Sequence, residues 1–389
     1  DKFTAYADGN AIKFTGGYST DTPYNMYVAV YDSNERLIGT RINTAKGSFE
    51  ELPNGEYKVS CYIWNEQQKA MDDKVTKTVI IKSEIETDSY LFAHFVGNEA
   101  DASHEQIYFS VSEDGQNWTT LNDQKPVLTS TVGEQGVRDP YILRGEDGKF
   151  FIIATDLSIY NRQQRGEDAW SNCQKSGSKS IVVWESADLV HWEEARLVNI
   201  AVDNAGCTWA PEAIYDPEKG MYMVFWASKI SDDNFSNQRM YKSYTIDFKT
   251  FTEPEIFIET DVSNIDTTII EHKGIYYRFT KNESNSSVIM EKSRFLDGQW
   301  SAVEGYNLGT MTGYEGPLIY KLNGEDKWCL LLDAYASRGG YKPFVTDDLE
   351  SGVFTQGSDF TFDGTYRHGT VMPITRAEYN RFIEAYGSA

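Results

Sequence analysis

The chain has 389 residues, with 36 Lys and Arg against 59 Asp and Glu, which gives a net charge of −23. This length allows one large domain or two ordinary ones, and the acidic balance argues against binding nucleic acid or anionic membrane through a basic surface. No stretch approaches the roughly 18 apolar residues of a transmembrane helix. The 25 Tyr and 9 Trp suit half-buried strands, and their flat faces also suit the apolar faces of sugars.

The four cysteines, Cys61, Cys173, Cys207 and Cys329, are scattered without a CxxC pair or a Cys/His cluster, which argues against zinc. We expect Cys61 and Cys329 to be buried thiols, and the sequence leaves open whether Cys173 and Cys207 pair. The chain begins at Asp1 in a polar stretch. We expect that a signal segment has been removed, so that the protein is secreted, periplasmic or at the cell surface.

Residues 1–86 are predicted to form a small β-domain. Met26, Val28 and Val30 alternate with residues of the opposite face, and the same period of two recurs near Cys61, as in strands with one buried face. The Asn-Gly pair at 54–55 is a strong turn signal. Several such runs predict an immunoglobulin-like β-sandwich, followed by a polar linker.

From Tyr90 onward, a motif of the form S/T-x-D-x-x-x-W/F recurs. The clearest copies run from Ser112 to Trp118, from Ser186 to Trp192 and from Thr245 to Phe251, and looser copies end at Trp300 and Phe354. The Ser and Asp of such a motif can bond the backbone of a turn. Five copies at intervals of about 50 to 75 residues indicate a repeated β-unit.

A second series of polar motifs opens the first strand of each unit. Its members are Arg138-Asp139-Pro140, Ala210-Pro211-Glu212, Ile265-Asp266, Glu315-Gly316-Pro317 and Arg367-His368-Gly369. In the first four units a turn, a second strand and a hairpin follow. Four strands per unit and five units predict an all-β fold, a five-bladed β-propeller over residues 87–389.

The fifth unit is predicted to be split. Residues 368–375 form an inner strand followed only by a short helix at 376–386, whereas residues 90–95 and 106–111 are strands without an inner partner. Pairing the two parts completes the ring and removes a free sheet edge.

The inner strands of a propeller converge on its axis, so the residues at their starts should meet at one end of the channel. These residues are Asp139, Glu212, Asp266, Glu315 and His368, and the spacing predicts that they stand at equivalent positions. Crowded carboxyls raise each other's pKa, so one can stay protonated near neutral pH. Glycoside hydrolysis uses one carboxylic acid and one carboxylate in this way. The alternative is chance enrichment in an acidic chain.

On these motifs, together with Trp209-Ala210-Pro211, the sequence from about Tyr90 to Ile374 resembles glycoside hydrolase family 43. The resemblance implies an inverting glycosidase acting on plant-type oligosaccharides or polysaccharides. We expect an exo-acting enzyme, foremost an α-L-arabinofuranosidase with β-xylosidase close behind, although the sequence itself leaves the linkage and endo versus exo action open. It makes Asp139 the general base, Glu315 the general acid, and Asp266 the group that tunes and orients the acid. Glu212 and Asp266-Thr267-Thr268 depart from the usual motifs, which leaves the exact sugar open.

Further side chains are candidates for substrate contact: Arg138, Trp209 and Glu212 beside the catalytic positions, Arg338 in a rim loop, and Trp170 as a sugar platform. The resemblance also implies that His368 approaches a central cation, often calcium, through water. The alternative is an imidazole bonded only to its neighbours. No cofactor is needed for the chemistry, and we expect a monomer.

Two other functions stay open. A sialidase-type propeller would need a Tyr nucleophile and an arginine cluster, and the sequence suggests no basic cluster around the axis. A non-catalytic sugar-binding propeller would give its carboxyls no reason to differ in pKa. The N-terminal domain is expected to be a spacer rather than a sugar-binding module.

Overall fold

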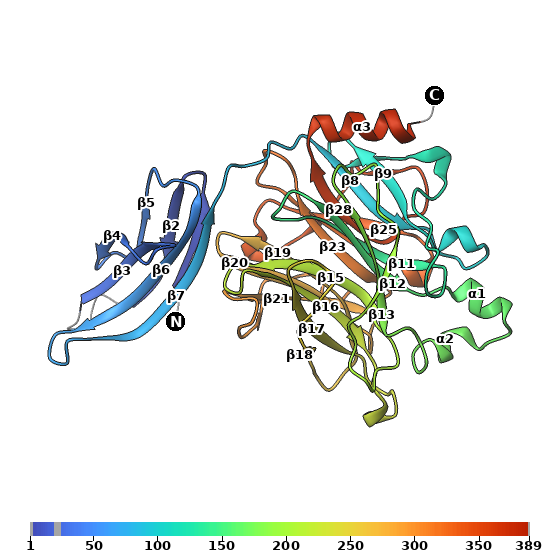
Figure 1. Cartoon of the computed structure of the whole chain (residues 1–389), viewed down its shortest axis with the longest axis horizontal. Helices are drawn as coiled ribbons and strands as arrows, with labels where there is room; N and C mark the ends of the chain where they lie inside the picture. The colour runs from blue at the N-terminus through green and yellow to red at the C-terminus, as the bar shows by residue number, and fades with distance from the viewer. Residues whose placement is uncertain (1–2, 19–24, 388–389) are drawn as a thin grey trace.

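A computed structural model describes residues 3–18 and 25–387. It is nearly all β-structure, with the short helices α1 (Ile159–Gln164), α2 (Ala169–Asn172) and α3 (Arg376–Tyr386) (Figure 1). Within those two ranges, no helix has the length and apolar character needed to cross a membrane. Asp1, on which the expectation of a removed signal segment rests, lies outside the described residues.

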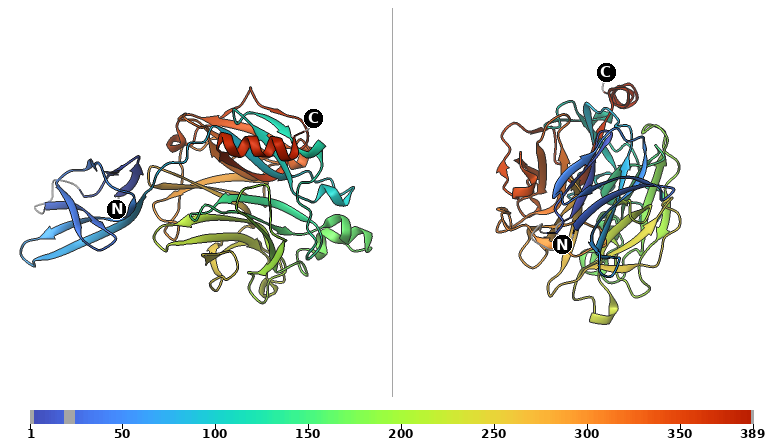
Figure 2. Two further views of the ribbon diagram at one scale, coloured as in Figure 1. Left: turned by 45° about the horizontal axis from the view of Figure 1, so that its top comes forward. Right: turned by 90° about the vertical axis from the view of Figure 1, so that its left-hand side faces the viewer.

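The first seven strands form two antiparallel sheets. Their orders are β1 (Thr4–Asp8), β2 (Ala11–Thr15), β5 (Lys46–Phe49), and β4 (Leu37–Ile42), β3 (Asn25–Asp32), β6 (Gly55–Asn65), β7 (Ala70–Ile81). A single core between them contains Phe14, Val28 and Val59, and its buried members all lie between residues 3 and 81. Figure 2 shows these sheets standing beside the remainder of the molecule.

Four further sheets follow in chain order, each with antiparallel neighbours. The first contains β11 (Val137–Arg144), β12 (Phe150–Asp156), β13 (Ser180–Ser186) and β14 (Arg196–Asn199), and the second β15 (Trp209–Asp216), β16 (Met221–Ser228), β17 (Arg239–Thr245) and β18 (Glu255–Ile258). The third contains β19 (Asn264–His272), β20 (Ile275–Asn282), β21 (Ser287–Ser293) and β22 (Ser301–Ala302), and the fourth β23 (Glu315–Lys321), β24 (Trp328–Asp333), β25 (Tyr341–Thr346) and β26 (Thr355–Gln356).

The last sheet joins two distant parts of the chain. Its order is β27 (Thr361–Phe362), β10 (Asn117–Thr120), β9 (Tyr108–Ser112), β8 (Ser89–Phe95) and β28 (Arg367–Ile374). Strand β28 pairs antiparallel with β8, with Thr370 opposite Ala93. The predicted split unit is therefore confirmed, as is the terminal helix, which Thr375 begins with a capping box. The first strands β11, β15, β19, β23 and β28 contact one another in a closed cycle.

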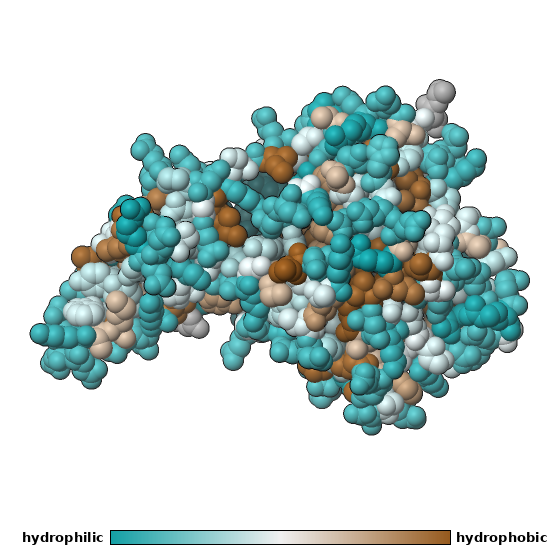
Figure 3. All heavy atoms as spheres, viewed as in Figure 1, coloured by the Kyte–Doolittle hydropathy of each residue, from teal (hydrophilic) through white to brown (hydrophobic). Residues whose placement is uncertain are grey.

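The repeated S/T-x-D motif forms a turn between the third and fourth strands of a sheet, as predicted. In one copy, Asp188 Oδ1 accepts hydrogen bonds from the backbone N–H groups of Val190 and His191, and Ser186 Oγ accepts one from Leu189. The copies at Asp114 and Asp247 make the same bonds. Polar residues cover much of the surface in view in Figure 3, in keeping with the acidic composition.

All four cysteines are buried and free. Cys173 and Cys207, whose pairing the sequence left open, are therefore thiols. Burial raises the pKa of Cys173 to about 12 and that of Cys207 to about 11. Neither thiol is a reactive nucleophile near neutral pH.

Each strand of the inner cycle carries a β-bulge near its start. The last paired residues before these bulges are Arg138, Trp209, Ile265, Glu315 and Arg367. In the first four strands, the residue that follows has a positive φ of 49° to 52°: Asp139, Ala210, Asp266 and Gly316. A bulge bends a strand and redirects a side chain. The start of every inner strand is therefore bent in the same way.

The prediction that the four carboxyls stand at equivalent positions is wrong. Asp139 and Asp266, like His368, directly follow the last paired residue, whereas Glu315 is itself that residue. Glu212 comes later and is the first residue paired after its bulge. Spacing counted along the sequence cannot locate the unpaired residues of a bulge, so it aligned the strands but not their individual side chains.

Candidate active site

The starts of the inner strands line a cavity of about 640 Å³. All five residues that directly precede the bulges contribute to it. A smaller recess of about 80 Å³ shares five lining residues with this cavity, including Arg138, Trp209 and Glu315. Asp139 and Asp266 also line the recess. The structure therefore brings the three predicted catalytic carboxyls together at one place.

Asp139 is held in its charged form. Its Oδ2 accepts a hydrogen bond of 2.8 Å from Thr155 Oγ1, and its Oδ1 lies 3.3 Å from His368 Nδ1. The Thr155 hydroxyl in turn accepts the Ala210 N–H at 2.7 Å, which fixes its direction. Burial opposes ionisation, but the hydrogen bond and charge of His368, with help from Arg138, hold the pKa of Asp139 below its ordinary value.

Asp266 occupies the same bulge position on its own strand but titrates differently. Its Oδ2 accepts the Gly316 N–H at 2.9 Å, and its Oδ1 lies 3.8 Å from His368 Nδ1. Burial, reinforced by the negative charges of Glu315 and Asp139, raises the pKa of Asp266 to about 7 against the attraction of His368. Near neutral pH, the recess therefore holds one ionised carboxylate and one carboxyl that keeps a proton much of the time.

His368 is the centre of a buried charge cluster. Its Nδ1 faces Asp139 and Asp266, and its Nε2 lies 3.9 Å from Glu212 Oε1. Burial by itself lowers the pKa of the imidazole, but these carboxylates raise it well above its ordinary value. The outcome is a buried imidazolium surrounded by carboxylates.

This arrangement does not fit the central calcium ion that the family resemblance implied at His368. The contact was expected to run through water, so His368 would not ligate the ion itself, but the positive charge of a protonated imidazole repels a cation beside it. In the parts of the chain that the structure describes, no group of three or more His, Cys, Asp or Glu side chains is arranged to hold a metal ion. We therefore assign no catalytic step to a metal.

Glu212 lines neither the cavity nor the recess, although the sequence suggested it for substrate contact. Its side chain is buried beside His368. Burial raises the pKa of Glu212 to about 7, against the hydrogen bond and charge of His368. Its position assigns Glu212 to the buried charge cluster.

Two cations hold Glu315 at the edge of the recess. Lys281 Nζ donates to Glu315 Oε2 at 3.0 Å, and Arg367 Nη2 donates to Oε1 at 3.1 Å. The Arg367 Nε also donates to Asp333 Oδ2 at 2.6 Å. Asp333 is fully buried, and burial raises its pKa to about 6 against the attraction of Arg367. The Glu315 side chain, 21% exposed, is thus accessible and fixed in place.

The sequence did not single out Lys281, Asp333 or Arg367 as site residues. Arg367 stands in the polar motif of the fifth unit, at the position that Glu315 occupies in the fourth unit, so this correspondence could have identified it as a site residue. Lys281 lies opposite Ile265, and Asp333 opposite Glu315, each on the second strand of its sheet. Only the strand register, which the bulges obscure, could have revealed these two.

Four of the five predicted contact residues do line the larger cavity: Arg138, Trp170, Trp209 and Arg338. Arg138 Nη1 donates to Glu105 Oε2 at 2.9 Å and to Glu99 Oε1 at 3.1 Å. Its guanidinium lies 5.2 Å from the centre of the Trp170 ring. Trp170, on α2, is 44% exposed, so its ring remains accessible to a sugar.

The expectation that no basic cluster surrounds the axis is wrong. Five cations line the larger cavity: Arg138, Lys229, Lys281, Arg338 and Arg367. They come from different sheets and loops, so no local sequence pattern reveals their convergence. Arg138, Lys281 and Arg367 each form an ion pair with a nearby carboxylate.

Comparisons with known proteins agree with the motifs. Residues 86–380 match the model of the glycosyl hydrolase family 43-related family, described as "probable glycosyl hydrolase domain". The chain is 30% identical over 340 residues to an α-L-arabinofuranosidase of Bifidobacterium longum subsp. longum. That match covers 74% of this chain and 31% of the other, so the chain spans about a third of its relative's length.

Several solved structures are also similar. A thermostable family-43 glycoside hydrolase is 18% identical, with 61% of this chain and 77% of the other covered and a TM-score of 0.42. A mutant α-L-arabinanase of Cellvibrio cellulosa is 16% identical, with 77% and 95% covered and a TM-score of 0.45. A Hadza microbial sialidase is 12% identical, with 95% and 89% covered and a TM-score of 0.47. On the match of residues 86–380, the chain belongs to the glycosyl hydrolase family 43-related family.

Proposed function

We propose that this chain is an inverting, exo-acting glycoside hydrolase that removes terminal or branching α-L-arabinofuranosyl units from plant-type polysaccharides or oligosaccharides. The observation that carries the proposal is the recess of about 80 Å³ that Asp139, Asp266 and Glu315 line together. Their environments hold Asp139 ionised and let Asp266, next to the proposed acid Glu315, keep a proton near neutral pH, so both the carboxylate and the proton that acid–base hydrolysis uses are present. The named relative supports the choice of sugar; β-xylosidase or another exo-glycosidase of the family is the alternative.

Asp139 is the general base in this mechanism. His368 and Thr155 keep its carboxylate charged and fix its orientation, so it can take a proton from a water molecule on one face of the sugar. Asp139 and Glu315 come from β11 and β23, which β28 separates on one side of the cycle. We expect their carboxyls to be about 6.5 to 9.5 Å apart, which leaves room for the water and inverts the anomeric carbon.

Glu315 is the general acid that protonates the leaving oxygen. Lys281 and Arg367 hold its two oxygens while the substrate binds. The charge of Glu315 is one cause of the raised pKa of Asp266, so these two carboxyls together avoid carrying two negative charges. In the proposed step, the proton that this pair holds passes through Glu315 to the leaving oxygen as the glycosidic C–O bond breaks, while Asp139 takes a proton from the attacking water.

The same proposal includes the finer architecture. We take the five sheets formed by β8 to β28 as the blades of a five-bladed β-propeller over residues 87–389, supported by the closed cycle of inner strands. We also take residues 1–86 as an immunoglobulin-like sandwich, supported by the two sheets and shared core of the described residues in this range. Because polysaccharide substrates lie outside the cytoplasm, we also propose that the enzyme is secreted, periplasmic or at the cell surface. We propose that it acts as a monomer.

A second candidate is a sialidase-type hydrolase acting on a sugar acid. The observation that favours it is that three arginines, Arg138, Arg338 and Arg367, line the same cavity as Tyr335. However, Glu105 and Asp333 already engage Arg138 and Arg367. The Tyr335 hydroxyl shares a hydrogen bond of 2.7 Å with Ser286 Oγ. The arabinofuranosidase assignment therefore needs less rearrangement of the site.

A panel of 4-nitrophenyl glycosides, followed by proton NMR of the first-formed sugar before mutarotation, tests the proposal. We expect hydrolysis of the α-L-arabinofuranoside with release of the β-anomer. A product that retains the substrate configuration would contradict the role of Asp139. Cleavage of a sialoside alone would favour the second candidate, and full activity of Asp139→Asn would exclude a catalytic Asp139.

A further inference from the structure

A second large cavity, of about 550 Å³, lies where the N-terminal sheets meet the sheet of β19 to β22. Its lining includes Lys46 from β5 and Lys273 from the turn between β19 and β20. Lys273 lies seven residues after Asp266, just past the end of β19, or about 23 Å away at 3.3 Å per residue. The cavity is therefore separate from the candidate active site.

Direct contacts hold the two walls of this cavity together. Thr4 Oγ1 and Lys77 Nζ both donate to the Gly274 carbonyl, at 3.1 and 3.2 Å. Gly274 has a φ of 78°, and a Cβ there would lie 2.4 Å from Thr4 Oγ1 and 2.7 Å from the Ala5 carbonyl oxygen. Only glycine allows this approach. Figure 1 shows β7 beside β20 at this junction.

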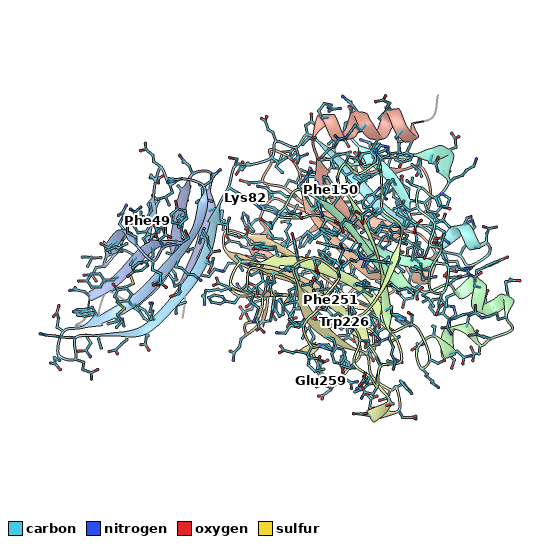
Figure 4. All side chains as sticks on the ribbon, viewed as in Figure 1. Phe49, Lys82, Phe150, Trp226, Phe251 and Glu259 are labelled. Atoms are coloured by element: carbon cyan, nitrogen blue, oxygen red, sulfur yellow. The ribbon has the colours of Figure 1, made fainter. Side chains whose placement is uncertain are left out.

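A second contact lies close to the linker. Lys82 Nζ donates to both carboxylate oxygens of Glu146 at 3.0 Å, and Figure 4 labels Lys82 where the two parts of the chain meet. Thr78 adds a third contact, since its Oγ1 donates to Glu218 Oε2 at 2.7 Å. Together these contacts fix the position of the N-terminal sheets against the sheets that follow, and so the shape of the cavity between them.

The lining of the cavity is basic although the protein has a net charge of −23. Four cations, Lys46, Lys273, Lys292 and Arg294, face a single carboxyl, Glu350. The three lysines are exposed, so their ammonium groups remain in water and accessible. A local positive field of this kind attracts anions, and the cations are less neutralised here than in the active-site cavity, where three carboxyls face five cations.

The strand register explains why lysines from both walls meet in this gap. Lys46 pairs with Thr15, which pairs with Thr4, so the three form one row across β5, β2 and β1. On the opposite wall, Lys292 pairs with both Tyr277 and Ser301 across β20, β21 and β22. Directly paired residues point to the same face of a sheet. The two rows therefore turn their lysines and hydroxyls toward the same cavity.

We propose that this cavity binds a carboxylate-bearing segment of a polysaccharide, that is, a run of uronate residues. The lysines of the two walls match anionic groups repeated along a chain, and the Thr15 and Ser301 hydroxyls can hydrogen-bond sugar hydroxyls. The volume lies within the range of about 300–1,000 Å³ that small-ligand sites occupy. Binding there would keep the enzyme on an acidic polymer and raise the local concentration of branch ends at the active site.

The anion-binding site does not depend on the glycosidase assignment, whereas its role in bringing branch ends to the active site rests on that proposed function, and the test separates the two. Binding of oligogalacturonate to the full chain is measured by calorimetry at low and high salt. The variants are Lys46→Glu, Lys273→Glu, Lys292→Glu and the double variant of the last two. The matched control is Lys125→Glu, at an exposed lysine that follows the turn η2 (Asn122–Gln124) and lies outside the cavity.

We expect the wild type and the control to bind, with affinity falling as salt rises. The double variant should lose at least about tenfold in affinity, and Lys46→Glu should weaken binding from the other wall. All variants should hydrolyse a small nitrophenyl glycoside as the wild type does. Absent binding, or binding insensitive to the cavity variants, would overturn the proposal. Binding of a dextran sulfate oligomer but not oligogalacturonate would overturn the carboxylate assignment in favour of sulfate esters.

Discussion

Replacing Glu315 by Gln tests the proposed acid directly. Loss of a general acid costs about 10²- to 10⁴-fold in rate, or about 3 to 5 kcal/mol of transition-state stabilisation. This loss should appear on an arabino-oligosaccharide, whose leaving oxygen needs a proton. A nitrophenyl glycoside has a leaving group that departs with little protonation, so its loss should be about tenfold or less.

The structure indicates that the Glu315→Gln protein will fold. Its amide oxygen can still accept one hydrogen bond, Lys281 keeps Glu283 as an ion-pair partner, and Arg367 keeps Asp333. We expect a stability loss of about 1 to 2 kcal/mol, from the weakening of charged hydrogen bonds. That is small beside the roughly 5 to 15 kcal/mol of an ordinary domain.

The assay is kcat/KM on both substrates, with Glu283→Gln as the matched control. Glu283 lines the same large cavity and pairs with the same lysine, but it does not line the recess. The control should show a small loss of similar size on the two substrates. If Glu315→Gln lowers both rates equally, Glu315 is not the general acid.

Three further predictions follow from the structure. Because burial raises the pKa of Asp333 to about 6, its protonated form contributes about 3 kcal/mol to the free energy of unfolding below about pH 4, and this contribution is lost as the pH rises through about 6. The side chain in Asp333→Asn cannot ionise, so its free energy of unfolding, measured in urea from pH 4 to 7, should lack this decrease of about 3 kcal/mol. A pH dependence identical to wild type would contradict the shift. Deleting residues 367–389 removes β28 and exposes β8, so light scattering should detect aggregation, and an active, well-folded truncation would refute the closing role of β28. Gly274→Val should separate the domains, seen as faster proteolysis near residues 82–88, while activity on a small glycoside stays unchanged. Proteolysis at the wild-type rate would contradict the need for glycine there.

Much of the fold was predictable because its signals are local. Turn motifs, the period of two and the missing inner strand each leave a pattern in a short stretch of sequence, so even the pairing of β28 with β8 was anticipated. Asp139 and Glu315 were predictable for the same reason, since each stands in a polar motif at a strand start.

The remainder of the site depends on contacts between strands. Lys281 and Asp333 stand in strands whose sequences resemble many others, and their roles arise only from what lies opposite them. The central position of His368 was anticipated, but its protonation depends on distances to three carboxylates, which no sequence spacing supplies.

The pairing of β28 with β8 also governs how the protein is made. The two strands lie about 280 residues apart in the chain, and contacts over such separations form slowly. A ribosome adding about 5 to 20 residues per second needs roughly 15 to 55 s to travel that distance. Throughout that interval, the edge of β8 that β28 later covers has no native partner. The newly made protein is therefore most open to aggregation or chaperone capture before its last sheet closes, however stable the finished molecule is.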